Sequence, residues 1–173
     1  MSSQVPYFGV PNFWLVDAPN NICRGAQPTK EGFDYLKSQF GIARIVKLNT
    51  DAEGSDDYAQ SIGMTVLKFP IPAWRQTVWS PVQADLVSAV KAIIPGTFVH
   101  CGSDKRTEGY EPDDIDHVGG NDRTGLIIGL YRRFKMGWYK DNAYAEMIAH
   151  GFHEVLLGGL CRAWDRQTPE MWV

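Results

Sequence analysis

The sequence predicts an α/β fold with a central, mostly parallel sheet, helices on both faces and a helical C-terminal region. Two observations carry this prediction. Between residues 13 and 101, short apolar stretches rich in β-branched residues alternate with amphipathic helical stretches, which is typical of parallel strands joined by helices. After residue 126 only helical patterns remain. With 173 residues, 44% of them hydrophobic, the chain can bury one core, so we expect a single domain over 1–173.

The first elements are a strand and a capped helix. Residues 13–16 form a short apolar stretch ahead of a polar turn at 17–21. Thr29 can cap a helix whose first turn contains Glu31, where the helix dipole favours an acid. Apolar positions 33, 36 and 40 share one face of this helix, and Gly41 ends it.

The middle of the chain continues the alternation. We expect strands at 43–49 and 64–71, separated by a short helix that Ser55 caps, with Asp56 and Asp57 in its first turn. Pro81 opens a helix with apolar positions 82, 86, 90 and 93 on one face, and a strand at 97–101 follows. A core helix from Leu126 to about 135–137 and helices at 143–150 and 152–164 complete the prediction.

The stretch from residue 97 to residue 125 carries the chemistry. An apolar strand ends in His100-Cys101, and a glycine-rich run leads to Arg123 just before the apolar helix. Successive backbone N–H groups ahead of a helix N-terminus form an anion site, and a thiol placed there is pushed toward thiolate. The sequence therefore predicts an anion site with a reactive cysteine.

These residues resemble the phosphate loop of the cysteine-dependent protein tyrosine and dual-specificity phosphatases, whose pattern is His-Cys, five residues, Arg, Ser or Thr, Gly. Residues 24–29 also resemble the Arg-Ser-Gly-Gln-Pro-Thr signature of a group of small atypical dual-specificity phosphatases, with Gly25-Ala26 in place of Ser-Gly. The resemblance implies the dual-specificity phosphatase fold and hydrolysis of a phosphate monoester through a phosphocysteine intermediate.

The spacing departs from the family pattern. Arg123 lies 22 positions after Cys101 instead of six, which leaves sixteen surplus residues. Removing residues 102–117 restores the pattern, and so does removing 103–118 or 104–119. We call residues 102–117 the inserted segment; it has six acidic and two basic residues, net charge −4, no apolar period and two breakers, and so predicts an exposed loop.

The resemblance assigns a role to each residue of the loop. Cys101 attacks phosphorus, and the planar fork of Arg123 grips two phosphate oxygens. Thr124 hydrogen-bonds the sulfur and helps it leave, and His100 organises the loop. The remaining donors are backbone N–H groups of Gly119, Gly120, Asn121 and Asp122. Chemistry of this kind uses no cofactor and no metal.

The general acid has several candidates. Many relatives use an aspartate in the loop that here spans residues 70–79, which contains no carboxylate. Asp122 precedes the arginine, as in myotubularin-like and some bacterial tyrosine phosphatases, where that aspartate donates the proton, and it is the favoured acid. Asp113, Asp114 and Asp116 in the inserted segment are alternatives. Trp74 and Arg75 are candidates for the pocket mouth.

Composition narrows the partners. The net charge of −3 and the lack of a basic stripe argue against nucleic acid, and no apolar run is long enough to cross a membrane. Three cysteines far apart do not form a disulfide framework, which favours a cytoplasmic protein. The expected partner is a phosphorylated protein or small molecule, and phosphotyrosine, phosphoserine or phosphothreonine, and inositol phosphates all stay open.

Three other functions fit parts of the pattern. If the inserted segment keeps Cys101 away from Arg123, the domain is a pseudophosphatase or a module that binds a phosphorylated ligand. Cys101 and Arg106 have the spacing of a rhodanese-like sulfurtransferase loop, although the apolar helix that such a loop needs does not follow. His117 lies six positions before Arg123 and is the last alternative nucleophile.

Overall fold

The computed structural model describes residues 8–71, 81–102, 119–153 and 158–173. Its strands are β1 (Trp14–Asp17), β2 (Ile22–Ala26), β3 (Arg44–Lys47), β4 (Thr65–Lys68) and β5 (Thr97–Cys101). Its helices are α1 (Lys30–Phe40), α2 (Asp57–Ser61), α3 (Gln83–Lys91), α4 (Asp122–Phe134), α5 (Lys140–Ala149), α6 (Gly158–Asp165) and the 3₁₀ helix η3 (Pro169–Trp172). Among these described residues, no helix has the length and apolar character needed to cross a membrane.

The strands form one five-stranded sheet in the order β1-β2-β5-β3-β4. Only β1 runs antiparallel to its neighbour; the other three pairings are parallel. Strand β5 lies at the centre, where His100 is level with Gly25 of β2 and Lys47 of β3. The carboxyl end of β5, with Cys101, therefore lies between two other strand ends.

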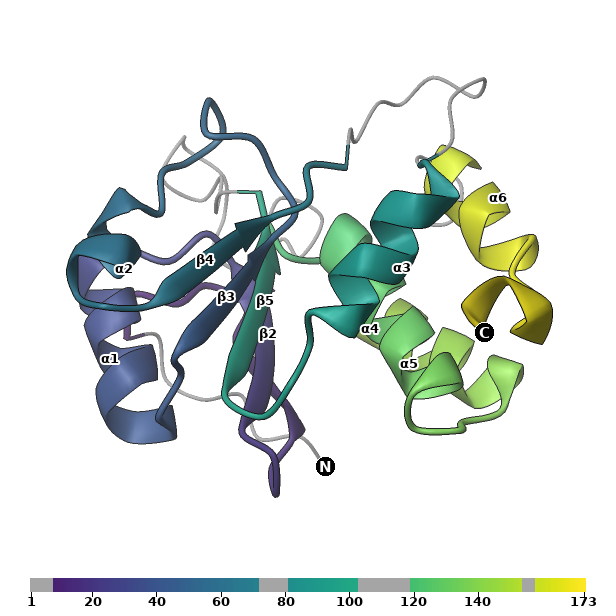
Figure 1. Ribbon diagram of the computed structural model, residues 1–173, viewed down its shortest axis with the longest axis horizontal. Helices are drawn as coiled ribbons and strands as arrows, with labels where there is room; N and C mark the ends of the chain where they lie inside the picture. The colour runs from purple at the N-terminus through teal and green to yellow at the C-terminus, as the bar shows by residue number, and fades with distance from the viewer. Residues whose placement is uncertain (1–7, 72–80, 103–118, 154–157) are drawn as a thin grey trace.

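Helices cover both faces of the sheet, with α1 and α2 on one side and α3 to α6 on the other (Figure 1). Successive residues of a strand point to opposite faces, and β5 follows this rule. Phe98 packs in a core with Phe33 of α1, whereas Val99 packs in the larger core with Leu126 of α4. The predicted α/β class, mostly parallel sheet and helical C-terminus are confirmed.

The first helix forms as its sequence predicts. The Thr29 hydroxyl accepts a hydrogen bond from the Gly32 N–H at 3.2 Å, and this caps α1. Gly41 ends the helix in the left-handed conformation with φ of 62°, which glycine adopts without steric cost. Strand β2 precedes this helix, and its last residue, Ala26, is level with Cys101 of β5.

Several helix starts differ from the prediction: α5 begins at Lys140 and not at residue 143, α6 begins at Gly158 and not at residue 152, and α2 and α4 differ as well. The Ser55 hydroxyl does accept a hydrogen bond from the Asp57 N–H at 3.1 Å, and Asp57 lies in the first turn of α2 as predicted. Asp56, however, is the buried N-cap residue, so the prediction that Ser55 is the cap and Asp56 lies in the first turn is wrong by one residue. Helix α4 begins at Asp122, four residues before Leu126. Polar residues in its first turn carry no apolar period, which is why the sequence pattern placed the start too late.

Candidate active site

The two ends of the candidate phosphate loop meet in space. Cys101 ends β5 and Arg123 lies in the first turn of α4, and their exposed fractions are only 3% and 6%. A Cβ atom added to Gly102 would lie 3.5 Å from Nη2 of Arg123 and 4.0 Å from Cα of Gly119. The chain therefore departs at Gly102 and returns at Gly119 to almost the same point. Of the three junctions that restore the family spacing, this geometry favours removal of residues 103–118.

The thiol and the guanidinium interact directly. Burial alone would lower the pKa of Arg123, but negative charge on Cys101 and hydrogen bonds to Glu53 and to the sulfur raise it overall. Arg123 is therefore a permanent cation next to the sulfur.

Glu53, in the loop after β3, holds the guanidinium of Arg123 in place. Its carboxylate accepts from Nη2 at 2.6 Å and from Nη1 at 3.2 Å, and Nη1 also donates to the Ile71 carbonyl at 3.2 Å. Burial acts to raise the pKa of Glu53, but the bonds from Arg123 and Thr50 lower it to about 2. The contribution of this ion pair to stability is therefore fully present above about pH 4.5 and is lost as the pH falls toward 2. No local sequence pattern indicates this contact, because the partners are 70 residues apart.

Asn12 and Arg24 hold the half of the loop that follows the inserted segment. The Asn12 amide donates to the Gly119 carbonyl at 3.0 Å and to the Asn121 side chain at 2.6 Å. Arg24 donates through Nη2 to the carbonyl of Gly120 at 2.9 Å. Gly120 has φ of 85°, and a Cβ there would lie 2.4 Å from the Gly25 carbonyl oxygen, so only glycine fits.

A buried charged cluster lies beneath the other half of the loop. Nε2 of His100 and Oδ2 of Asp56 are 2.7 Å apart, and Oδ1 of Asp56 accepts from Gln27 at 2.7 Å and from Lys47 at 3.3 Å. Burial acts to raise the pKa of Asp56, but the bonds from His100 and Gln27 and the charge of Lys47 lower it overall. Asp56 thus holds the ring of His100 at the end of the strand, and the role of His100 in organising the loop stays a prediction.

Asp122 is the first residue of α4, and its carboxylate contacts His153. Oδ1 of Asp122 accepts from the His153 N–H at 2.7 Å, and the ring Nδ1 lies 3.0 Å from both carboxylate oxygens. Asn121, not Asp122, is the N-cap residue of the helix. The side chain of Asp122 is 20% exposed, so solvent can reach it.

For some predicted residues the structure gives the position but does not test the role, and others lie outside the described residues. Thr124 is buried, and its hydroxyl forms no hydrogen bond within the described part of the chain, so its bond to the sulfur stays a prediction. The predicted site residues that lie outside the described ranges are Trp74, Arg75, Arg106, Asp113, Asp114, Asp116 and His117. Burial raises the pKa of Cys23 to about 12, which makes that thiol inert.

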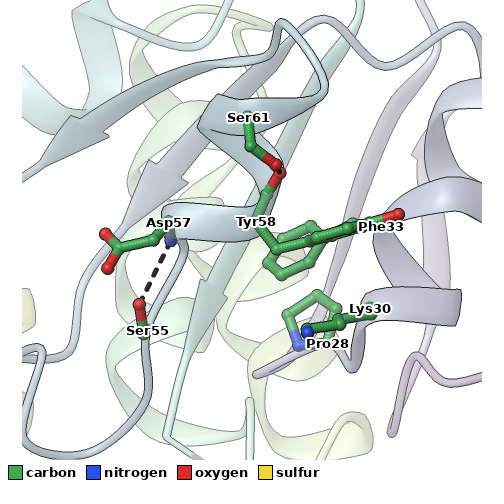
Figure 2. Close-up of a pocket in the computed structure, with 7 residues that line it drawn as sticks. All are labelled: Pro28, Lys30, Phe33, Ser55, Asp57, Tyr58 and Ser61. Atoms are coloured by element: carbon green, nitrogen blue, oxygen red, sulfur yellow. Dashed lines mark hydrogen bonds between the residues drawn. The ribbon is translucent and has the colours of Figure 1, made fainter.

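A separate surface pocket lies between α1 and α2. It has a volume of about 450 Å³, and Phe33, Tyr58 and Lys30 are among its lining residues (Figure 2). Tyr58 is held by hydrogen bonds of 3.0 Å to both carboxylate oxygens of Asp34. None of the predicted catalytic residues lines this pocket. The pocket is therefore distinct from the candidate loop between β5 and α4.

Comparisons with known proteins agree on the fold. No protein-family model and no curated protein matches the sequence. Among solved structures, P. aeruginosa TpbA matches with a TM-score of 0.69 and 18% identity, over 99% of this chain and 92% of TpbA. The catalytic core of the PP-IP phosphatase SIW14 from S. cerevisiae, in complex with citrate, matches with a TM-score of 0.69 and 17% identity, over 98% of this chain and 92% of that one. PTPMT1 in complex with PI(5)P matches with a TM-score of 0.61 and 14% identity, over 88% of this chain and 94% of that one. The chain thus has the fold of cysteine-based phosphatases.

Proposed function

We propose that this protein hydrolyses phosphate monoesters through a phosphocysteine intermediate on Cys101. The observation that carries the proposal is the meeting of Gly102 with Gly119 and Arg123, which brings thiol and arginine together despite the surplus residues. The likeness in fold to a PP-IP phosphatase supports the same reaction class. The proposed loop consists of Cys101, Gly102, Gly119, Gly120, Asn121, Asp122 and Arg123.

The reaction has two steps. The Cys101 thiolate attacks phosphorus, the P–O ester bond breaks, and the leaving oxygen takes a proton from Asp122. Water then attacks the phosphocysteine, its proton returns to Asp122, and the P–S bond breaks to release inorganic phosphate and the thiolate. Arg123 stabilises the equatorial oxygens in both steps, and Thr124 donates to the departing sulfur.

Hydrolysis of an aryl phosphate tests this proposal. Wild type should turn over p-nitrophenyl phosphate, with inhibition by orthovanadate. Cys101→Ser should abolish turnover, and so should Arg123→Lys, because an ammonium lacks the bidentate fork. Arg133→Lys, in the half-buried last turn of the same helix, where Arg133 donates to the Gln167 carbonyl at 3.1 Å, is the matched control and should keep full activity. Undiminished turnover in Cys101→Ser would refute the cysteine mechanism.

The substrate class follows from a panel. TpbA, SIW14 and PTPMT1 share this fold, and PTPMT1 binds PI(5)P in its complex. The panel therefore contains phosphotyrosine and phosphoserine peptides, inositol phosphates and PI(5)P. The ratio of kcat/KM values between these substrates, measured on the wild type, identifies the preferred class.

A further inference from the structure

Two side chains outside the predicted phosphate loop contact its backbone from the N-terminal part of the chain. Arg24 lies on β2, where Cys23 packs with the α1 side of the sheet. Alternation along the strand directs Arg24 to the opposite face, toward α4. A Cβ added to Gly125 would lie 3.8 Å from Nη2 of Arg24, which confirms that the guanidinium lies against the start of that helix.

These contacts involve three consecutive carbonyl groups. Asn12 donates to the Gly119 carbonyl, and Nη2 of Arg24 donates to the carbonyl of Gly120 at 2.9 Å and approaches that of Asn121 at 3.4 Å. In a trans peptide the C=O of one residue and the N–H of the next point in opposite directions. Fixing these carbonyls toward Asn12 and Arg24 therefore turns the N–H groups of residues 120–122 the other way.

Arg24 also adds positive charge beneath the loop. It is 1% exposed, and within the described part of the chain its Nε and Nη1 atoms have no hydrogen-bond partner. Burial lowers the pKa of Arg24 to about 10, against the raising effect of negative charge on Cys101, Glu146 and Asp122. Arg24 thus stays charged at neutral pH. A buried cation with donors to spare is costly unless an anion lies close by.

We propose that Asn12 and Arg24 are positioning residues that orient the backbone N–H groups of residues 120–122 toward the phosphate. This inference rests on the proposed anion site of the loop, and it adds two residues that do not touch substrate. It also explains how the second half of the loop keeps its shape without being contiguous with Cys101. The donors are preorganised by β2 and the segment before β1, independently of residues 103–118.

Binding of tungstate, a tetrahedral oxyanion, tests the inference without requiring turnover. Asn12 has φ of 51°, so Asn12→Gly removes the amide while it keeps a backbone that glycine accepts. Asn21 has φ of 50° and is exposed, which makes Asn21→Gly the matched control. By calorimetry on the full chain, Asn12→Gly should weaken tungstate binding about fivefold, the value of one hydrogen bond near 1 kcal/mol. Asn21→Gly should change it less than twofold.

Arg24→Lys is the second variant, because it keeps the charge but reaches the carbonyls poorly. Tungstate binding should weaken about tenfold or more, and native Cys101 should be alkylated by iodoacetamide more slowly at pH 6. Arg132→Lys is its control, since Arg132 is also buried, at 7% exposed, but pairs with Glu146 at 2.8 Å and has no hydrogen bond to the described part of the loop. If Arg24→Lys does not fold, Asn12→Gly carries the test alone.

The outcomes separate this inference from the proposed function. Tungstate binding unchanged in Asn12→Gly, or weakened as much in Asn21→Gly, would overturn the positioning role. Wild type that binds tungstate but hydrolyses no ester would contradict the phosphatase proposal and leave the positioning role standing. Wild type that binds no tungstate at all would overturn both.

Discussion

Deleting residues 103–118 should leave a folded and more active protein. Because a Cβ on Gly102 would lie 4.0 Å from Cα of Gly119, the two Cα atoms are within about 5.5 Å of each other. A direct peptide bond needs a separation of about 3.8 Å, so the splice requires a shift of under about 2 Å. Glycine on both sides of the junction accommodates such a shift.

The magnitude follows from loop length and charge. The wild-type chain has 21 residues between Cys101 and Arg123, and the deleted chain has five. Two doublings of loop length cost about 1.2 kcal/mol, so the deletion should raise the Tm by about 2–5 °C. It also removes a net charge of −4 from a segment tethered at both ends to the site. With a Debye length of ~8 Å, repulsion of a phosphate dianion by about 1 kcal/mol corresponds to roughly fivefold in kcat/KM.

Steady-state hydrolysis of p-nitrophenyl phosphate at 20 and 300 mM NaCl, with the Tm from calorimetry, is the assay. The deletion variant should have the higher kcat/KM and tighter vanadate binding, and the wild type should gain more from salt. Replacing residues 103–118 by sixteen glycines and serines separates the effect of length from that of charge. This variant should show most of the gain in kcat/KM that the deletion gives, but not the gain in Tm. A folded deletion variant without activity would refute the reasoning and place the acid at Asp113, Asp114 or Asp116.

Three further substitutions test the other contacts. Asp122→Asn should slow an alkyl phosphate by about 10²–10⁴ and p-nitrophenyl phosphate much less, because only a poor leaving group needs the proton; equal losses on both would indicate a structural role. Asp56→Asn leaves Lys47 without its buried partner and should cost on the order of 3 kcal/mol in urea unfolding at pH 7. Because the folded pKa of Asp56 is lowered, this difference should shrink as the pH falls below about 4, and a constant difference would contradict the assignment. Glu53→Gln should lower kcat/KM about tenfold, since Arg123 loses its charged partner; wild-type kinetics would show that Glu53 does not position the arginine.

Much of the fold was predictable from the sequence because local signals were strong. Helix α1 begins after Thr29 and ends at Gly41 as expected, and the apolar run at 97–101 is the central strand. The two ends of the phosphate loop were recognisable for the same reason, since each is a short contiguous motif. Whether they met depended on the path of sixteen residues without apolar pattern, which sequence alone does not determine.

The supporting residues were harder to predict. The sequence places Asp56 in the first turn of a short helix, yet Asp56 is the buried N-cap residue, and its carboxylate lies 2.7 Å from Nε2 of His100. Glu53 and Arg24 contact the loop across 70 and 96 residues of sequence. Such contacts depend on strand order, and β5 between β2 and β3 is a property of the whole sheet.

The tolerance of this loop to interruption has a physical basis in that sheet. Its first half is fixed by β5, whose last residues pair with β2 and β3, and the Gln27 N–H extends the pairing to the Gly102 carbonyl at 2.7 Å. Its second half is fixed by α4 and by donors from Asn12 and Arg24. Because each half has its own anchors, the geometry of the loop depends little on the peptide bonds between them. A long segment can therefore enter at Gly102 and leave at Gly119 while Cys101 and Arg123 stay together.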